Sequence, residues 1–108
     1  MKVTILLSTY NGEQFLSEQI KSIQEQTYRD WQLLIRDDGS TDGTRAVIED
    51  FCRKDDRIAF INRENPQNLG VIQSFHSLLQ YQDSDFYLFS DQDNVWLPDK
   101  IAMQLAEA

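Results

Sequence analysis

The 108-residue sequence is long enough for one ordinary domain, and its 41% hydrophobic and 11% aromatic content indicates a folded globule with a core. The formal net charge of -8 argues against a nucleic-acid-binding module, which would carry a basic patch. Cys52 is the only cysteine, which excludes an intramolecular disulfide and a thiolate metal cluster.

The first predicted elements are a strand and a helix. Residues 3–8 form an apolar run that predicts a buried strand, and Asn11-Gly12 after it is a turn signal. The run is too short for a signal peptide or a membrane span, so we expect a cytoplasmic chain. A helix is expected over residues 13–26, with its inner face formed by Phe15, Leu16, Ile20 and Ile23.

A second strand and helix follow. Residues 31–36 predict a strand, and residues 37–43 form a polar loop after it. The next helix is expected over residues 44–53, with Thr41 or Asp42 as its N-terminal cap.

The remaining sequence continues the alternation. Strands are predicted over residues 58–62 and 86–90, and Pro98 is expected to be the first residue of a last helix. Between the two strands, residues 71–81 predict a helix with an inner face made of Ile72, Phe75, Leu78 and Leu79.

Alternating strands and helices predict an α/β fold, with right-handed crossovers, a mostly parallel sheet and helices on both faces. No repeat or linker divides residues 1–108. The last predicted helix has neither a glycine cap nor a following strand. We therefore expect residues 1–108 to be the amino-terminal part of a larger catalytic domain.

Polar clusters follow three of the predicted strands. They are residues 8–11, Asp37-Asp38, and the segment from Asp91 to Asp93. Open α/β sheets bind ligands beyond the carboxyl ends of their strands, so these clusters are expected to share one crevice. Asp91 and Asp93 would project the same way from an extended chain, and two such carboxylates favour a hard divalent cation, Mg²⁺ or Mn²⁺.

Other functions fit the residues less well. Residues 38–49 approach the spacing of a calcium-binding EF-hand loop, but a strand precedes them where that motif needs a helix. Aspartyl phosphatases carry their D-x-D motif on the first strand, whereas here it follows the fourth. The only histidine, His76, lies within a helical pattern, which disfavours a Ser-His-Asp hydrolase, and no P-loop or dinucleotide fingerprint is present.

Four motifs stand in register along the chain: residues 3–11 (VTILLSTYN), residues 36–42 (RDDGSTD), residues 68–70 (NLG) and residues 91–93 (DQD). Together they resemble family 2 glycosyltransferases of the GT-A fold. Residues 91–101 further resemble the rhamnosyltransferase-like branch. The resemblance covers essentially the whole chain, and it implies the Rossmann-like, nucleotide-sugar-binding half of a GT-A domain.

The resemblance implies transfer of a sugar from a UDP- or dTDP-sugar donor to an acceptor hydroxyl, typically with inversion, in polysaccharide or cell-surface glycan synthesis. Thr9, Tyr10 and Asn11 would line the nucleoside pocket, and Asp38 would accept a hydrogen bond from the base. Gly70 and Asp91 also belong to the implied nucleotide-sugar site. Asp93 would be the principal ligand of Mg²⁺ or Mn²⁺ on the diphosphate, assisted by Asp91.

The sequence departs from the family pattern at two places. Residues 74–76 (SFH) stand where the family often has an arginine, and Asn94 stands where many members have a further acid. No residue is a convincing general base, which an inverting transferase needs, so we expect the base beyond Ala108 and an inactive 108-residue chain.

Expected partners are the donor and a glycan or lipid-linked acceptor, without nucleic acid. Peripheral membrane association of a longer protein and self-association of this chain are further hypotheses. A non-catalytic nucleotide- or metal-binding α/β module is the alternative function, because it would need the same crevice without the missing base.

Overall fold

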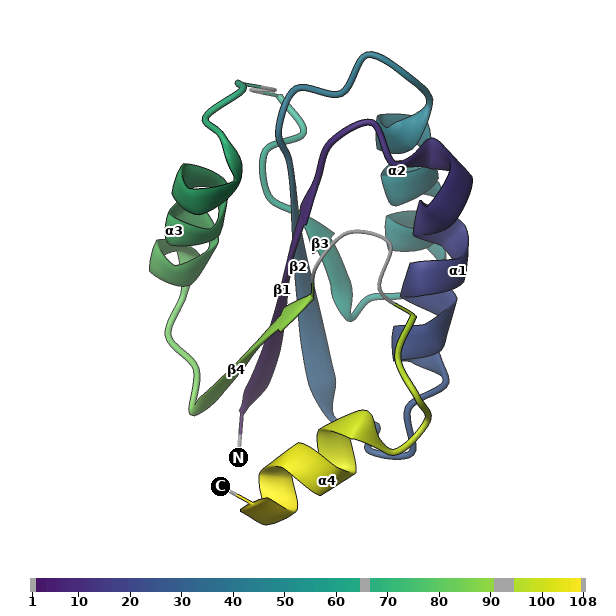
Figure 1. Cartoon of the computed structure of the whole chain (residues 1–108), viewed down its shortest axis with the longest axis vertical. Coiled ribbons are helices and arrows are strands. Elements are labelled where there is room, and N and C mark those ends of the chain that lie inside the picture. The colour runs from purple at the N-terminus through teal and green to yellow at the C-terminus, as the bar shows by residue number, and fades with distance from the viewer. Residues whose placement is uncertain (1, 65–66, 91–94, 108) are drawn as a thin grey trace.

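The structure, a computed structural model, describes residues 2–64, 67–90 and 95–107. Its elements alternate as predicted (Figure 1). In chain order they are β1 (Val3–Thr9), α1 (Glu13–Gln24), β2 (Trp31–Asp37), α2 (Thr44–Lys54), β3 (Ile58–Phe60), α3 (Val71–Tyr81), β4 (Phe86–Ser90) and α4 (Lys100–Glu107). The predicted bounds of α3 and β4 are confirmed, and the other bounds differ by one or two residues at an end.

Two local predictions about helix starts are wrong. Pro98 precedes α4, because its carbonyl accepts a hydrogen bond from the Thr27 amide at 2.8 Å and the helix begins only at Lys100. Gly43 occupies the N-cap of α2 in place of Thr41 or Asp42. Asp42 still serves this helix end from one residue earlier, since its Oδ1 accepts the Thr44 amide at 3.0 Å.

The four strands of the described chain form a parallel sheet in the order β3-β2-β1-β4. Because the chain leaves β1 for β2 on one side and returns to β4 on the other, the strand order reverses beside β1. The register pairs Ser8 with Arg36 and Thr9 with Asp37 at the carboxyl ends of β1 and β2. A switch in strand order is where such sheets bind ligands, so the predicted α/β fold and the location of its crevice agree.

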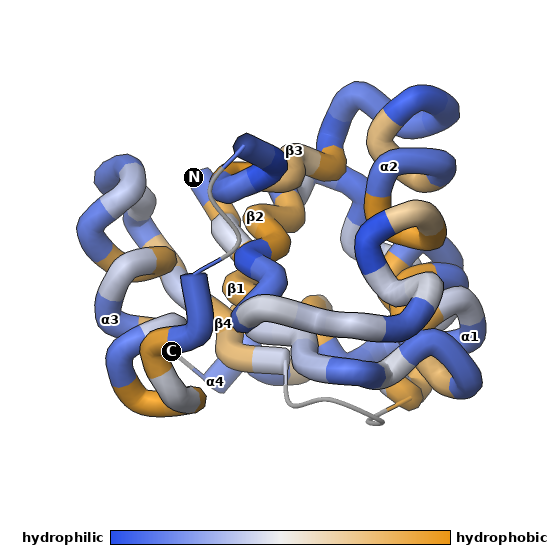
Figure 2. The backbone as a smooth tube through the Cα atoms, turned by 90° about the horizontal axis from the view of Figure 1, so that it is seen from above, coloured by the Kyte–Doolittle hydropathy of each residue, from blue (hydrophilic) through white to orange (hydrophobic). Residues whose placement is uncertain are grey.

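The sheet separates two layers of helices. Figures 1 and 2 show α1 and α2 on one side of the strands and α3 alone on the other. On the α1/α2 side, alternate strand residues such as Ile5, Leu33 and Leu88 meet Ile20 of α1 and Ile48 of α2 in the main core. Trp96 and Ile101 extend this core to α4. This face buries most of the apolar surface, which is the dominant favourable term in folding.

The α3 side has a much smaller core. Its buried residues are Leu6, Leu34 and Leu78, with partly buried neighbours that include Phe75. The predicted inner faces are therefore only partly right: Ile72 is 79% exposed and Leu79 is 38% exposed on α3. Phe15 on α1 is likewise 48% exposed, because none of the described elements buries the side of the helix on which it lies.

None of the helices in the described ranges is long and apolar enough to cross a membrane.

Candidate functional site

A pocket of about 300 Å³ opens at the carboxyl ends of β1 and β2, where the sequence predicts a crevice. It is lined by Ser8, Thr9, Tyr10, Asp38, Asn68, Gly70 and Val71. Four of the predicted nucleotide-sugar residues, Thr9, Tyr10, Asp38 and Gly70, are thus brought together from three separate segments. The lining combines an aromatic ring, a carboxylate and exposed backbone, as small-molecule sites do.

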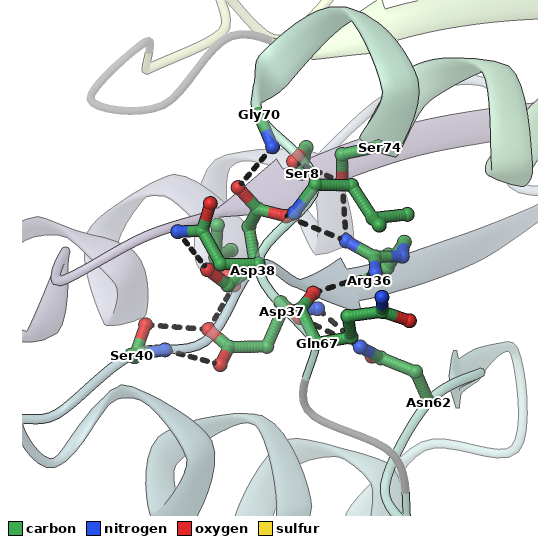
Figure 3. A network of polar contacts seen from close by, with 12 residues as sticks. Ser8, Arg36, Asp37, Asp38, Ser40, Asn62, Gln67, Gly70 and Ser74 are labelled. Carbon is green, nitrogen blue, oxygen red and sulfur yellow. Dashed lines mark hydrogen bonds and ion pairs between the residues drawn. The ribbon is translucent and has the colours of Figure 1, made fainter.

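Asp38 is the only carboxylate among the described residues of this lining, and it is 5% exposed. Its Oδ1 accepts hydrogen bonds from Arg36 Nη1 at 2.8 Å and from the Leu69 amide at 2.7 Å. Its Oδ2 accepts the Gly70 amide at 3.0 Å (Figure 3). The carboxylate therefore lies against the amino-terminal end of α3, where the helix dipole favours negative charge.

Asp37 is the neighbour of Asp38 but serves a different purpose. It is fully buried, and its Oδ1 accepts hydrogen bonds from Thr9 Oγ1 at 2.8 Å and Ser40 Oγ at 2.6 Å. Its Oδ2 accepts a hydrogen bond from the Ser40 amide at 2.8 Å. The Asn62 side chain accepts a hydrogen bond from the Asp37 amide and donates one to the Asp37 carbonyl. Asp37 is therefore a turn-forming residue, and the interpretation of Asp38 as the pocket carboxylate fits this geometry better.

The alternation of side chains along a strand explains this division. Residues 33, 35 and 37 of β2 face the α1/α2 side, as the core positions of Leu33 and Ile35 show. Leu34 and Arg36 face α3, and Asp38 turns toward the same helix beyond the strand end. In Figure 3 the Asp38 carboxylate points toward Gly70 and Arg36, whereas the Asp37 carboxylate points toward Ser40.

The residues after β1 are also divided. Thr9 is buried beneath the pocket, and Tyr10 is 48% exposed at its wall. Asn11 adopts a left-handed backbone with φ 47°, which asparagine tolerates better than most residues. Its side chain accepts the Thr41 amide at 2.8 Å and is not among the pocket-lining groups, so it joins two loops at the rim.

Position 70 requires glycine because of its backbone conformation, not because a side chain would lack room. Its φ of 87° and ψ of 159° lie in a region that L side chains rarely adopt, yet a Cβ placed there would meet nothing within 4 Å. This conformation turns the amides of Leu69 and Gly70 toward Asp38 and begins α3 at Val71. Gly70 therefore shapes the pocket through its main chain.

Arg36 and Ser74 are functional candidates that the sequence reasoning did not single out. Arg36 is 4% exposed, and its guanidinium donates to Asp38, to Ser74 Oγ at 3.1 Å and to the Gln67 carbonyl at 2.7 Å. Ser74 also accepts a hydrogen bond from Ser8 Oγ at 2.6 Å. One signal was available: a charged residue at the end of an apolar strand, since Arg36 follows Leu33, Leu34 and Ile35.

A buried polar stripe runs along the carboxyl half of α1 and just past it. Gln19 Nε2 donates to Ser90 Oγ at 3.0 Å, and Ser22 Oγ accepts the Trp96 amide at 3.0 Å. Gln26 donates to the Leu97 carbonyl at 2.6 Å and accepts the Ile101 amide at 3.0 Å. The stripe thus contacts the end of β4, residues 96–97 and the first turn of α4.

The predicted metal ligands Asp91 and Asp93, like Asn94, lie outside the described residues. Within the described ranges, no group of three His, Cys, Asp or Glu side chains could hold a metal ion. β4 ends at Ser90, whose pairing with Leu7 of β1 puts that strand end beside the pocket edge.

Asp42 lies in the loop between β2 and α2, beside the start of α1. The Thr44 hydroxyl beside Asp42 holds the pKa of that carboxyl below its usual value, against the opposing effect of burial. Its contacts are to the Thr44 and Glu13 amides, so it is a local acceptor for two helix ends. These contacts argue against an EF-hand loop, in which the Asp42 carboxylate would have to be free to bind a cation.

The similarity to known proteins extends over nearly the whole chain. Residues 4–108 match the profile of Glycosyl transferase family 2. The chain is 35% identical over 104 residues to the UDP-Glc:alpha-D-GlcNAc-diphosphoundecaprenol beta-1,3-glucosyltransferase of Escherichia coli, covering 96% of this chain and 40% of that protein. It is 38% identical over 98 residues to the dTDP-rhamnosyl transferase RfbG of Shigella flexneri, covering 88% of this chain and 34% of that protein.

Two solved structures have the same fold. The mannosyltransferase PcManGT from Pyrobaculum calidifontis, in complex with GDP-Man and Mn²⁺, superimposes with a TM-score of 0.82 at 22% identity, covering 93% of this chain and 30% of that one. S. aureus TarS 1-349 in complex with UDP gives 0.81 at 24% identity, covering 98% and 31%.

The chain spans two fifths or less of the length of these curated relatives. Its structural neighbours are GT-A glycosyltransferases, and the strand order, the pocket at the switch point and the matched profile agree with one another. The chain belongs to glycosyltransferase family 2.

Proposed function

We propose that this chain is the donor-binding part of a glycosyltransferase that uses a UDP- or dTDP-sugar. The observation that carries the proposal is the Asp38 carboxylate, held at the pocket between Tyr10 and Gly70 with its amide and guanidinium donors already in place. Uracil and thymine both present a ring N–H that such an acceptor can bind. Tyr10 supplies an aromatic wall for the base and Thr9 lies beneath it, while Asn11 acts from outside the lining by joining the two loops at the rim.

The diphosphate poses an electrostatic problem, because the chain carries a formal net charge of -8. We propose that Mg²⁺ or Mn²⁺ solves it, with Asp93 as principal ligand and Asp91 assisting it or contacting the sugar. When bound, the cation would act as a Lewis acid that neutralises charge on the departing nucleotide diphosphate. Support comes from the donor chemistry of paired carboxylates and from the neighbour crystallised with GDP-Man and Mn²⁺.

The proposed reaction is an inverting substitution. The acceptor oxygen bonds to the anomeric carbon, the bond from that carbon to the diphosphate breaks, and the nucleotide diphosphate leaves with the electron pair. The acceptor proton passes to a carboxylate base, which we place beyond Ala108. We propose a glycan or lipid-linked acceptor at the cytoplasmic side of a membrane, because the E. coli relative's name specifies a diphosphoundecaprenol-linked substrate.

Nucleotide titration tests the donor site. UDP and dTDP are titrated by calorimetry with and without Mn²⁺, using the unmodified chain and Asp93→Ala. We expect binding that needs the metal and weakens at least tenfold in Asp93→Ala, since a charged ligand contact is lost. Asp83→Ala is the matched control, because Asp83 is exposed before β4 at the opposite end of the sheet. Binding indifferent to both the metal and Asp93→Ala would refute the metal-bridged donor site.

A second assay separates the transferase from the alternative, a non-catalytic nucleotide-binding module. We expect no sugar transfer by the 108-residue chain, and transfer when the same sequence is followed by a family acceptor-binding half. Turnover by the 108-residue chain alone would refute the placement of the base, and nucleotide binding without turnover in both forms would favour the module.

A further inference from the structure

Arg36 is a deeply buried charged side chain that the proposed reaction does not use. Its side chain is 5% exposed, and three groups from different segments accept its hydrogen bonds. They are the Asp38 carboxylate beyond β2, the Gln67 carbonyl in the loop before α3, and Ser74 within α3. Arg36 does not itself line the pocket.

A charge in this position needs an explanation, because desolvation of a buried ion pair offsets much of its Coulombic gain. An apolar residue would extend the small core formed by Leu6, Leu34 and Leu78 on the same face. The planar guanidinium does something that an apolar side chain cannot. It fixes the angle of a carboxylate relative to two other segments, since its donors lie in a rigid fork.

The hydrogen bonds from the described residues leave one acceptor position on the Asp38 carboxylate without a donor. A carboxylate offers about four acceptor positions, two on each oxygen. Oδ1 receives two donors, Arg36 and the Leu69 amide, whereas Oδ2 receives one donor among the described residues, the Gly70 amide. One acceptor position on Oδ2 is therefore left for a ligand in the pocket that Asp38 lines.

We infer that Arg36 is a positioning residue that sets which nucleobase the pocket accepts, by fixing Asp38 as an oriented acceptor. The inference rests on the proposed function and adds to it a residue that determines nucleobase selectivity. Every protein contact to the carboxylate comes from an N–H group, so the ligand must also supply a donor. Uracil and thymine present an imide N–H at this position, while cytosine presents an unprotonated ring nitrogen, which would face the carboxylate lone pair.

Arg36 also balances charge in the pocket. The guanidinium lies 2.8 Å from the carboxylate, so the pair adds no net charge beside an anionic ligand. Loss of Arg36 would leave a buried carboxylate uncompensated and held only by two backbone amides. Its orientation and its effect on an approaching diphosphate would both change.

The test is the ratio of CDP to UDP dissociation constants, measured by calorimetry in the same metal buffer. For the unmodified chain we expect UDP to bind about tenfold to a hundredfold more tightly than CDP, the range for one hydrogen bond to a charged group. In Arg36→Met we expect UDP binding to weaken about tenfold or more and the ratio to fall toward one. A purely structural role would weaken both nucleotides equally and leave the ratio unchanged.

Arg57→Met is the matched control. Arg57 also pairs with an aspartate two residues away, Asp55, and with a backbone carbonyl, that of Arg29. It lies at the opposite end of β2, stacked 3.8 Å from the Trp31 ring centroid. We expect this variant to be less stable than the unmodified chain but to keep the full CDP to UDP ratio. All measurements are made at a temperature where circular dichroism shows each variant folded.

Arg36→Lys covers the case in which Arg36→Met does not fold. Lysine keeps the charge but lacks the planar fork, so we expect a folded chain with an intermediate ratio. An unchanged ratio in the folded Arg36 variants would overturn the inference and leave the donor site intact. Absence of UDP binding by the unmodified chain would overturn the proposed function together with the inference.

Discussion

The two faces of the sheet are built in different ways. Among the described residues, the α1/α2 face is an apolar layer of fourteen buried side chains that reaches from β3 to α4. In the same part of the chain the α3 face has three buried apolar residues near its middle, and at the carboxyl end of the strands it becomes a polar network of Ser8, Arg36, Asp38 and Ser74. The same strands supply both faces by alternation of their side chains.

The difference shows that one face of this small α/β chain supplies most of the stability, while the other face holds the candidate site. Apolar burial on one face supplies most of the stability, because the hydrophobic contribution scales with buried area. The other face then tolerates buried charge, a glycine with positive φ and an open pocket, all of which cost stability. The face with less apolar burial is therefore the one that is suited to carry the site.

The comparison is tested most strongly by truncating one core residue on each face. We expect Ile20→Ala to lower the free energy of unfolding by about 4 kcal/mol and Leu78→Ala by about 3 kcal/mol, because the smaller cluster surrounds Leu78 with fewer apolar atoms. Guanidinium denaturation measures both. Ile72→Ala, at a 79% exposed position of α3, is the control and should change stability by less than about 0.5 kcal/mol. A larger loss of unfolding free energy for Leu78→Ala than for Ile20→Ala would contradict the conclusion that the α1/α2 face supplies most of the stability.

The polar stripe of α1 is the exception on the apolar face. Gln26→Ala leaves the Leu97 carbonyl and the Ile101 amide without their partner, so we expect a loss of about 2 to 3 kcal/mol. Hydrogen exchange should report faster exchange of the Ile101 amide than of amides in β1. Gln24→Ala, which removes a single contact to Asp55, is the matched control with a smaller effect. Unchanged protection of Ile101 would show that apolar packing alone holds α4.

Gly70→Ala tests the backbone side of the site face. We expect a loss of about 2 kcal/mol, because alanine is strained at φ 87° although its methyl group would meet no neighbour. UDP binding should weaken as well, since the strain displaces the amide that contacts Asp38. A D-alanine introduced at that position by chemical ligation is the control, because it accepts positive φ. Equal stability of the L- and D-alanine forms would contradict the conformational explanation.

The smallest expected effect concerns Asp55, at the amino end of the sheet and remote from the pocket. The Arg57 guanidinium beside Asp55 lowers the pKa of that carboxyl from 3.8 to about 2. A carboxyl with a lowered folded pKa stabilises the fold above its unfolded pKa, and this contribution is lost as the pH falls toward 2. We expect Asp55→Asn to cost about 1 kcal/mol at pH 7, given partial solvent screening, and only a small part of that at pH 2, where the folded carboxyl is about half protonated.

Urea denaturation across this pH range checks the prediction. Asp50→Asn is the control, because Asp50 pairs with Arg53 and Lys54 on the exposed surface of α2. A stability difference for Asp55→Asn that is as large at pH 2 as at pH 7 would mean that the residue acts through something other than its charge.

Much of the fold and part of the site could be predicted from the sequence. The apolar runs of residues 3–8 and 31–36 and the helical spacing of residues 71–81 are local patterns, and each led to the right element. The placement of Thr9, Tyr10, Asp38 and Gly70 around one pocket follows from topology, because the carboxyl ends of parallel strands share an edge.

Predictions about side-chain environment were less successful. Phe15, Ile72 and Leu79 have the spacing of inner-face residues, yet all are exposed because no element in the described part of the chain buries them. Asn11 turns to the Thr41 amide, a contact 30 residues away in sequence. Periodicity describes one helix or one strand, whereas burial depends on what packs against it.

The acidic pair at the end of β2 shows most clearly what each source of information decides. By itself the sequence determined that two carboxylates stand at the end of a buried strand, at a ligand-binding edge, because a strand, its end and its polar loop are local features. Only the tertiary structure decided that Asp37 closes a turn under Thr9 while Asp38 meets Arg36 and the start of α3. The physical reason is that their partners come from β1 and from residues 67–74, which spacing within the motif cannot specify.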